Sequence, residues 1–254
     1  MIFYSLLLFY IFSRSQQECK VNGERFMCPD INLILDYHNE LRSKVALGQT
    51  KLRAGKGIWV LKWDHDLAKD AQDWADKCTL KHNENRPCDT GENIAWQTAG
   101  DVGPFDIEGI IEIWFDEIDQ YNPGINGIQI GTENFTQLIW GDTKFIGCGT
   151  NTFQNDMDKT VFHIVMICYY KPSGNIKNQP PYNYLEVTDG YGETDEFRRC
   201  EGKIPSVRFH GLCAHDADHS FGNYNPCKGY GNNVKPTAWF STVILLYAFY
   251  NFIC

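Results

Sequence analysis

Ten cysteines in a chain of 254 residues constrain this sequence more than any other feature. Residues 1–15 contain a short apolar run, Ile2 to Phe12, followed by Ser13 and Ser15 as small residues for cleavage, which is typical of a secretory signal peptide. The run is shorter than the ~20 apolar residues of a membrane-spanning helix. Because exported proteins fold in an oxidising environment, we predict that the cysteines form disulfides rather than a metal site or a nucleophile.

The overall composition indicates one packed domain with additional segments. Hydrophobic residues make up 43% of the chain and aromatic residues 14%, which is enough for a sizeable core. The net charge of -9 argues against nucleic acids and acidic membranes as the main partners.

The C-terminal residues 237–254 are almost wholly apolar, and no charged residue follows them. Small residues and a polar spacer precede this tail, which is the outline of a GPI-attachment signal. Two alternatives remain open, namely a helix or strand packed on the domain and a membrane anchor. Removal of the tail would take Cys254 with it and leave an odd number of cysteines, which counts against cleavage.

Helical periodicity dominates the first half of the chain. A first helix is predicted after Asp30 as N-cap, with an apolar stripe that includes His38, whereas Asn39 and Arg42 are expected off that stripe. A second helix begins at Asp64 or Asp66, and a third runs from Pro104 to Tyr121 with Glu117 at the border of its apolar side. The segment around Glu92 favours a helix start over a position in a cavity.

Strand signals come late in the chain. A short helix capped by Thr132 leads through a turn to a strand at residues 145–149, and residues 161–170 predict a buried strand. Helices first and strands late predict an α+β fold. Residues 183–236 are rich in Pro, Gly and Asn and indicate a loop-rich, disulfide-tied appendage or a partly flexible stalk, whose histidines we interpret as solvated rather than metal-binding.

Several segments, in one order, resemble the CAP family (SCP/TAPS), which includes cysteine-rich secretory proteins, antigen 5 venom allergens and pathogenesis-related class 1 proteins. They are LDYHNELRSKVA (35–46), LKWDHDLAKDAQDWADKC (61–78), GENIAW (91–96), IWFDEI (113–118), NFTQLIWGDTKFIGCG (134–149) and VMICYYKPSGNI (165–176). The resemblance covers residues 30–182, after a signal peptide (1–15) and an N-terminal disulfide segment (16–29). Within the family, this sequence resembles the venom-allergen-like members.

The resemblance implies a three-layer α-β-α sandwich with a cavity lined by two His and two Glu. The first His matches His38, and the two Glu match Glu92 and Glu117. The position of the second His is occupied by Asn134. Because an amide is a poor ligand and cannot act as a general base, we expect neither zinc binding nor proteolysis at this set of residues.

Asn134 also begins the only N-x-S/T sequon, Asn134-Phe135-Thr136. Glycosylation requires an accessible side chain, whereas a cavity position would bury it. The two interpretations exclude each other in the folded protein.

The resemblance further implies a disulfide order. It pairs Cys28 with Cys78, Cys19 with Cys88, and Cys148 with Cys168. Cys200, Cys213 and Cys227 would then supply one pair and an odd thiol, or two pairs together with Cys254.

The function implied is that of a secreted or surface-tethered, non-catalytic protein whose ligand is a sterol, another lipid or an extracellular protein. The alternative is a metal-dependent or His/Glu hydrolase that uses His38, Glu92 and Glu117. Neither nucleic acid nor a cofactor is expected.

Overall fold

The computed structural model describes residues 25–100, 105–125, 127–154, 160–186, 196–220 and 222–228. The predicted signal peptide, the apolar tail at 237–254, Cys19 and Cys254 lie outside these residues, so the interpretations of both ends stay predictions. Within the described ranges, no helix has the length and apolar character needed to cross a membrane.

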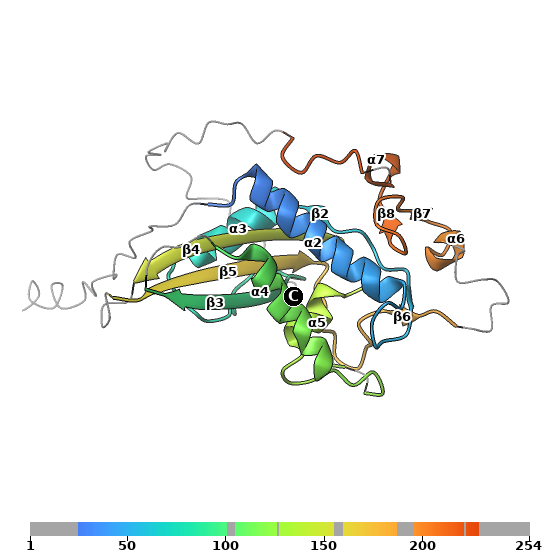
Figure 1. Cartoon of the computed structure of the whole chain (residues 1–254), viewed down its shortest axis with the longest axis horizontal. Helices are drawn as coiled ribbons and strands as arrows, with labels where there is room; N and C mark the ends of the chain where they lie inside the picture. Colours follow the sequence, from blue (N-terminus) through green and yellow to red (C-terminus); the bar gives the residue numbers. More distant parts are fainter. Residues whose placement is uncertain are drawn as a thin grey trace, which may run out of the picture.

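A four-stranded sheet forms the middle of the molecule (Figure 1). The strands lie in the order β2 (Lys62–Trp63), β4 (Phe145–Gln154), β5 (Phe162–Lys171) and β3 (Gly91–Ala99). β5 is antiparallel to both β4 and β3, and β2 is parallel to β4. The predicted strands at 145–149 and 161–170 are confirmed, but Glu92 lies in a strand rather than at a helix start.

Helices cover both faces of the sheet. Alternate residues of β5, Met166, Cys168 and Tyr170, pack in one core with α2 (Cys28–Ala46), α4 (Ile107–Asp116) and α5 (Glu133–Leu138). The intervening residues Val165, Ile167 and Tyr169 pack in a second core with α3 (His65–Ala75). Because successive strand side chains point to opposite faces, the sheet separates the two helical layers. The α+β sandwich is therefore confirmed.

Two glycines of β4 allow α3 to approach the sheet closely. A Cβ atom on Gly147 would lie 2.2 Å from the backbone nitrogen of Ala68, and one on Gly149 would lie 2.4 Å from that of Gln72. Both clashes would be with the helix backbone, which cannot move aside. This close contact explains why a glycine stands on each side of Cys148 in the strand.

Local capping sets the helix starts. The Asp64 carboxylate accepts hydrogen bonds from the backbone nitrogens of Asp66 and Leu67 and so begins α3. Asp106 caps α4, so this helix starts after the predicted Pro104. In α2 the N-cap is Met27 rather than Asp30, because Pro29 fits the first turn and the Asp30 carboxylate accepts a bond from the Met27 nitrogen.

Two polar residues of α2 were wrongly predicted to face outward. Asn39 and Arg42 are 1% and 0% exposed. The Asn39 amide exchanges two hydrogen bonds with the backbone of Leu61. The Arg42 guanidinium donates to the carbonyl oxygens of Trp59 at 2.8 Å, Leu138 at 2.8 Å and Thr143 at 3.2 Å. Both side chains are buried because backbone groups inside the fold need their hydrogen bonds.

The C-terminal extension is docked on the domain where the structure describes it. Its short elements are α6 (Glu196–Arg199), β7 (Ile204–Pro205), β8 (Cys213–Ala214) and α7 (Ala217–Ser220). The buried Arg199 donates to the carbonyl oxygens of Ala46 and Gly55, and Cys213 hydrogen-bonds the backbone of Ile58 and Val60. Gly55 belongs to β1 (Gly55–Lys56), which pairs with β6 (Asn183–Tyr184). Residues 196–220 are therefore a docked appendage and not a flexible stalk.

The disulfides confirm one implied pair and correct another. Cys148 is bonded to Cys168 as expected, and Cys200 is bonded to Cys213. Cys28 is bonded to Cys227 and not to Cys78, because the extension returns along α2 and brings Cys227 to the start of that helix. Cys78 and Cys88 are also disulfide-bonded.

We expect Arg42→Met to lower the free energy of unfolding by about 3 kcal/mol or more, because buried carbonyl oxygens lose their donor. Arg53→Met is the matched control, since Arg53 is exposed and should change stability by less than about 1 kcal/mol. Urea unfolding of the three proteins with intact disulfides measures the difference. Equal stability of the two variants would contradict a structural role for Arg42.

Candidate functional site

His38 belongs to the core and not to a cavity, which corrects the sequence-based assignment. Its side chain is fully buried, with Nδ1 2.7 Å from the carbonyl oxygen of Ile34 and Nε2 2.9 Å from the hydroxyl of Tyr170. Burial lowers the pKa of the His38 imidazole to about 4, so the ring is neutral at physiological pH. Both ring nitrogens are engaged, which leaves none for a metal or a substrate.

The imidazole beside Glu92 is that of His82, a residue the sequence analysis did not select. The Glu92 carboxylate is 1% exposed and lies 2.6 Å from His82 Nδ1, and it also accepts the backbone N–H of Asn83 at 3.1 Å. The Asn83 amide donates to the Tyr169 hydroxyl at 2.8 Å, and Tyr169 is the register partner of Glu92. The loop therefore closes over Glu92 and positions His82.

Little in the sequence marks His82. It lies in a polar loop without periodicity, and in the structure 61% of its side chain is exposed. The one signal in the sequence is that Cys78 and Cys88 flank the loop. Both are disulfide-bonded in the structure, so the two ends of the loop are held. His38 is assigned to the cavity by the resemblance alone, whereas its place on the apolar stripe of the helix is that of a core residue.

Glu117 and Asn134 form a second pair. Glu117 begins the 3-10 turn Glu117–Asp119, and Asn134 lies in the first turn of α5. The Asn134 amide nitrogen donates to Glu117 Oε1 at 2.6 Å, and the Phe135 backbone nitrogen donates to Oε2 at 2.9 Å. The Glu117 carboxylate therefore caps the N-terminus of α5, because the predicted cap residue Thr132 makes no side-chain hydrogen bond there.

Strand β3 connects the two pairs. Glu92 points to the face with Tyr169, while its neighbour Asn93 donates from its amide nitrogen to the Asn134 carbonyl oxygen at 2.9 Å. Among the described residues, no group of three His, Cys, Asp or Glu side chains is arranged to hold a metal ion. The Glu117 oxygen nearest Asn134 accepts the hydrogen bond of the Asn134 amide.

The sequon lies at the same position. Thr136 is 3% exposed, and its hydroxyl donates to Asn175 Oδ1 at 2.6 Å. The Asn134 amide nitrogen, which would carry a glycan, is the atom that contacts Glu117. This geometry favours the site interpretation of Asn134 over glycosylation of the folded chain.

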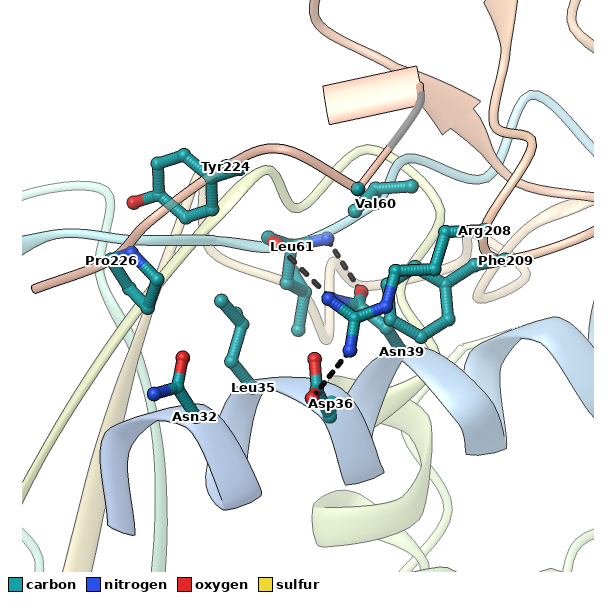
Figure 2. Close-up of a pocket in the computed structure, with 11 residues that line it drawn as sticks. Asn32, Leu35, Asp36, Asn39, Val60, Leu61, Arg208, Phe209, Tyr224 and Pro226 are labelled. Carbon is teal, nitrogen blue, oxygen red and sulfur yellow. Dashed lines mark hydrogen bonds and ion pairs between the residues drawn. The ribbon is translucent and has the colours of Figure 1, made fainter. Parts of the chain in front are cut away.

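A small pocket between α2 and the extension is a packed interface. Figure 2 shows Arg208 reaching to Asp36, with Nη2 2.7 Å from Oδ2, while Tyr224 and Pro226 lie at the opposite end of the pocket. Its volume is about 20 Å³, which holds about one water molecule. It is too small for a ligand and indicates instead how closely the extension covers the helix.

Comparisons with known proteins agree with this architecture. A family model described as the cysteine-rich secretory protein family, CAP, matches residues 35–170. Venom allergen 5 of Dolichovespula arenaria is 34% identical over 165 residues, which cover 59% of this chain and 79% of that protein. The CRISP/Allergen/PR-1 protein of Trittame loki is 30% identical over 228 residues, or 84% of this chain and 54% of the relative.

Two solved structures are similar as well. The structure of BmVAL-1 matches with a TM-score of 0.59 at 24% identity and covers 78% of this chain and 99% of that one, which bears on the fold alone. The crystal structure of NaASP2 with Zn2+ matches with a TM-score of 0.55 at 26% identity over 71% of this chain and 92% of that one.

The buried His38 predicts a pH dependence of stability. Because the folded pKa is about 4 and the unfolded pKa about 6.5, protonation favours the unfolded state between these values. Stability from the neutral ring is present above pH 6.5 and is lost as the pH falls toward 4. Between pH 7 and pH 5 the free energy of unfolding should fall by about 2 kcal/mol more in the wild type than in His38→Gln. Urea unfolding at both pH values is the measurement, and equal losses in the two proteins would contradict it.

Proposed function

This chain belongs to the cysteine-rich secretory protein (CAP) family, and from that membership we propose that it is a non-catalytic extracellular protein that binds a lipid or another protein. Its venom allergen relatives support an extracellular location. The observation that carries the non-catalytic proposal is the hydrogen bond from the Asn134 amide to Glu117, at the position where the family resemblance implies a histidine.

That hydrogen bond argues against metal chemistry. Glu117 accepts from the Asn134 amide and from the Phe135 backbone, so both of its oxygens are engaged in holding α5. A metal at this position would displace the amide and receive only a weak oxygen ligand in return. NaASP2, a relative by fold, was crystallised with Zn2+, so zinc is the metal to test.

A hydrolase is the alternative. His82 and Glu92 form a close pair that could act as a base and its orienting carboxylate. His38 is excluded from such a role by its burial, and Asn134 cannot transfer a proton at neutral pH. The remaining pair lacks the second imidazole, which is why binding is the better-supported proposal.

Zinc titration by calorimetry tests this argument. We expect the wild type to show no zinc binding tighter than about millimolar, and Asn134→His to bind at least about 100-fold more tightly, because an imidazole beside Glu117 is a better zinc ligand than an amide. In the Asn134→His background, Glu117→Gln should remove the gain and His38→Gln should keep it. Wild-type zinc affinity equal to that of Asn134→His would contradict the argument from Asn134.

An apolar surface supports a lipid or apolar protein ligand. Isoleucines from two loops are exposed, with exposed fractions of 52% for Ile125, 51% for Ile128, 96% for Ile130 and 42% for Ile176. The loops adjoin each other, since a Cβ atom on Gly127 would lie 2.9 Å from the backbone nitrogen of Asn178. A contiguous exposed apolar patch marks an interaction site, and these two adjoining loops are where we propose one.

We expect the mature protein to bind a sterol or fatty acid in a radioligand assay, and Ile128→Ser combined with Ile130→Ser to weaken that binding by about 10-fold, given ~25 cal/mol for each Å² of apolar surface buried. Ile113→Ser is the control, because Ile113 is 62% exposed on α4 and outside both loops. Absence of lipid binding would remove the lipid half of the proposal and leave an extracellular protein as the ligand to seek.

A further inference from the structure

A groove of about 250 Å³ lies where three segments of the chain meet. One wall is Lys56, which ends β1, and Gly57; the second is the turn 140–142 before β4; the third is the segment 179–183, which leads into β6 and ends on its first residue. The groove shares no residue with His82, Glu92, Glu117 or Asn134. Its volume lies just below the roughly 300–1,000 Å³ of sites for drug-sized ligands, so it suits a smaller one.

The walls of the groove are held by backbone hydrogen bonds. The Gly141 nitrogen donates to the Pro181 carbonyl oxygen at 2.7 Å, and the Gly57 nitrogen donates to that of Arg199 at 2.8 Å. Lys56 pairs with Asn183 in the β1–β6 register. A site whose walls are already fixed loses little conformational entropy when a ligand binds.

The rim of the groove carries polar side chains available for a ligand. Asp142, Gln179 and Asn183 are exposed, and their side chains form no hydrogen bond or ion pair with any residue that the structure describes. Lys56 Nζ lies 4.0 Å from Glu201 Oε1, a long separation for an ion pair. The rim therefore offers a carboxylate that accepts, an ammonium that donates and two amides that do both.

Apolar residues also line the groove. Pro180 is half-buried there, and Pro181, Trp140 and Tyr182 are buried behind it. The Tyr182 hydroxyl donates to the Arg53 carbonyl oxygen at 3.0 Å, which fixes that ring. A ligand for this groove therefore needs an apolar face and a polar edge that both donates and accepts hydrogen bonds.

We propose that this groove binds a single neutral sugar ring, such as the terminal residue of an extracellular glycan. Sugar hydroxyls donate to the Asp142 carboxylate and accept from Lys56, and the amides of Gln179 and Asn183 serve either role. The C–H face of the ring packs on the half-buried Pro180. One carboxylate and one ammonium at the rim balance each other, which favours a neutral ring over a sulfated or cationic one.

Nuclear magnetic resonance titration of the full chain with methyl glycosides tests the proposal. The probes are the methyl pyranosides of glucose, galactose, mannose, fucose and N-acetylglucosamine, with a sulfated disaccharide as the anionic comparison. We expect at least one neutral glycoside to bind at millimolar concentration and to shift the amide signals of residues 140–142 and 179–183. Asp142→Asn should weaken this binding about 10-fold, because a charge-assisted hydrogen bond is lost.

Asn183→Ala is the second variant and should weaken binding less, by about 3-fold, because its lost bond is uncharged. Asp116→Asn is the matched control on an exposed part of α4 and should leave binding unchanged. The proposal is overturned if no neutral glycoside binds, if the sulfated disaccharide binds more tightly, or if Asp142→Asn binds as the wild type does. Lipid binding should be the same in Asp142→Asn and wild type, so failure here is separable from failure of the proposed lipid function.

Discussion

The buried guanidinium of Arg42 is the interaction on which the rest of this structure depends. Burial lowers its pKa to about 9, so the group is still charged at neutral pH. Its hydrogen bonds go to carbonyl oxygens of Trp59, Leu138 and Thr143, which join α2 to the segment before β2, the end of α5 and the turn before β4. A charge in the core is stable only when such partners surround it. The same turn forms one wall of the proposed sugar groove, and α5 carries Asn134.

The candidate site depends on the sheet as much as on its own residues. β3 presents Glu92 to one face and Asn93 to the other, so a single strand holds both the His82–Glu92 pair and the helix that bears Asn134. Glu117 completes the first turn of α5 and also receives the Asn134 amide. At this position the side chains stabilise the fold, because the Asn134 amide and the Phe135 backbone both bond to Glu117.

The C-terminal extension covers helix α2 of the CAP domain. Arg199 bonds to the end of α2, Arg208 pairs with Asp36 in the middle of that helix, and Cys227 is bonded to Cys28 at its start. Contacts along the whole helix explain why little more than one water fits between the two parts. Ligand sites must therefore be sought on other faces, at the isoleucine loops and at the groove beside Asp142.

The sequence by itself determined the fold class, the family, the strands around Cys148 and Cys168 and the Glu117–Asn134 position, because short-range periodicity and contiguous motifs carry that information. It did not reveal His82, which lies in a loop without a pattern, or the burial of Asn39 and Arg42, whose polarity predicts a surface position. The Cys28–Cys227 bridge spans a sequence separation of 199 residues. These features were decided by the tertiary structure, because they depend on which backbone groups and which distant segments come together when the layers pack.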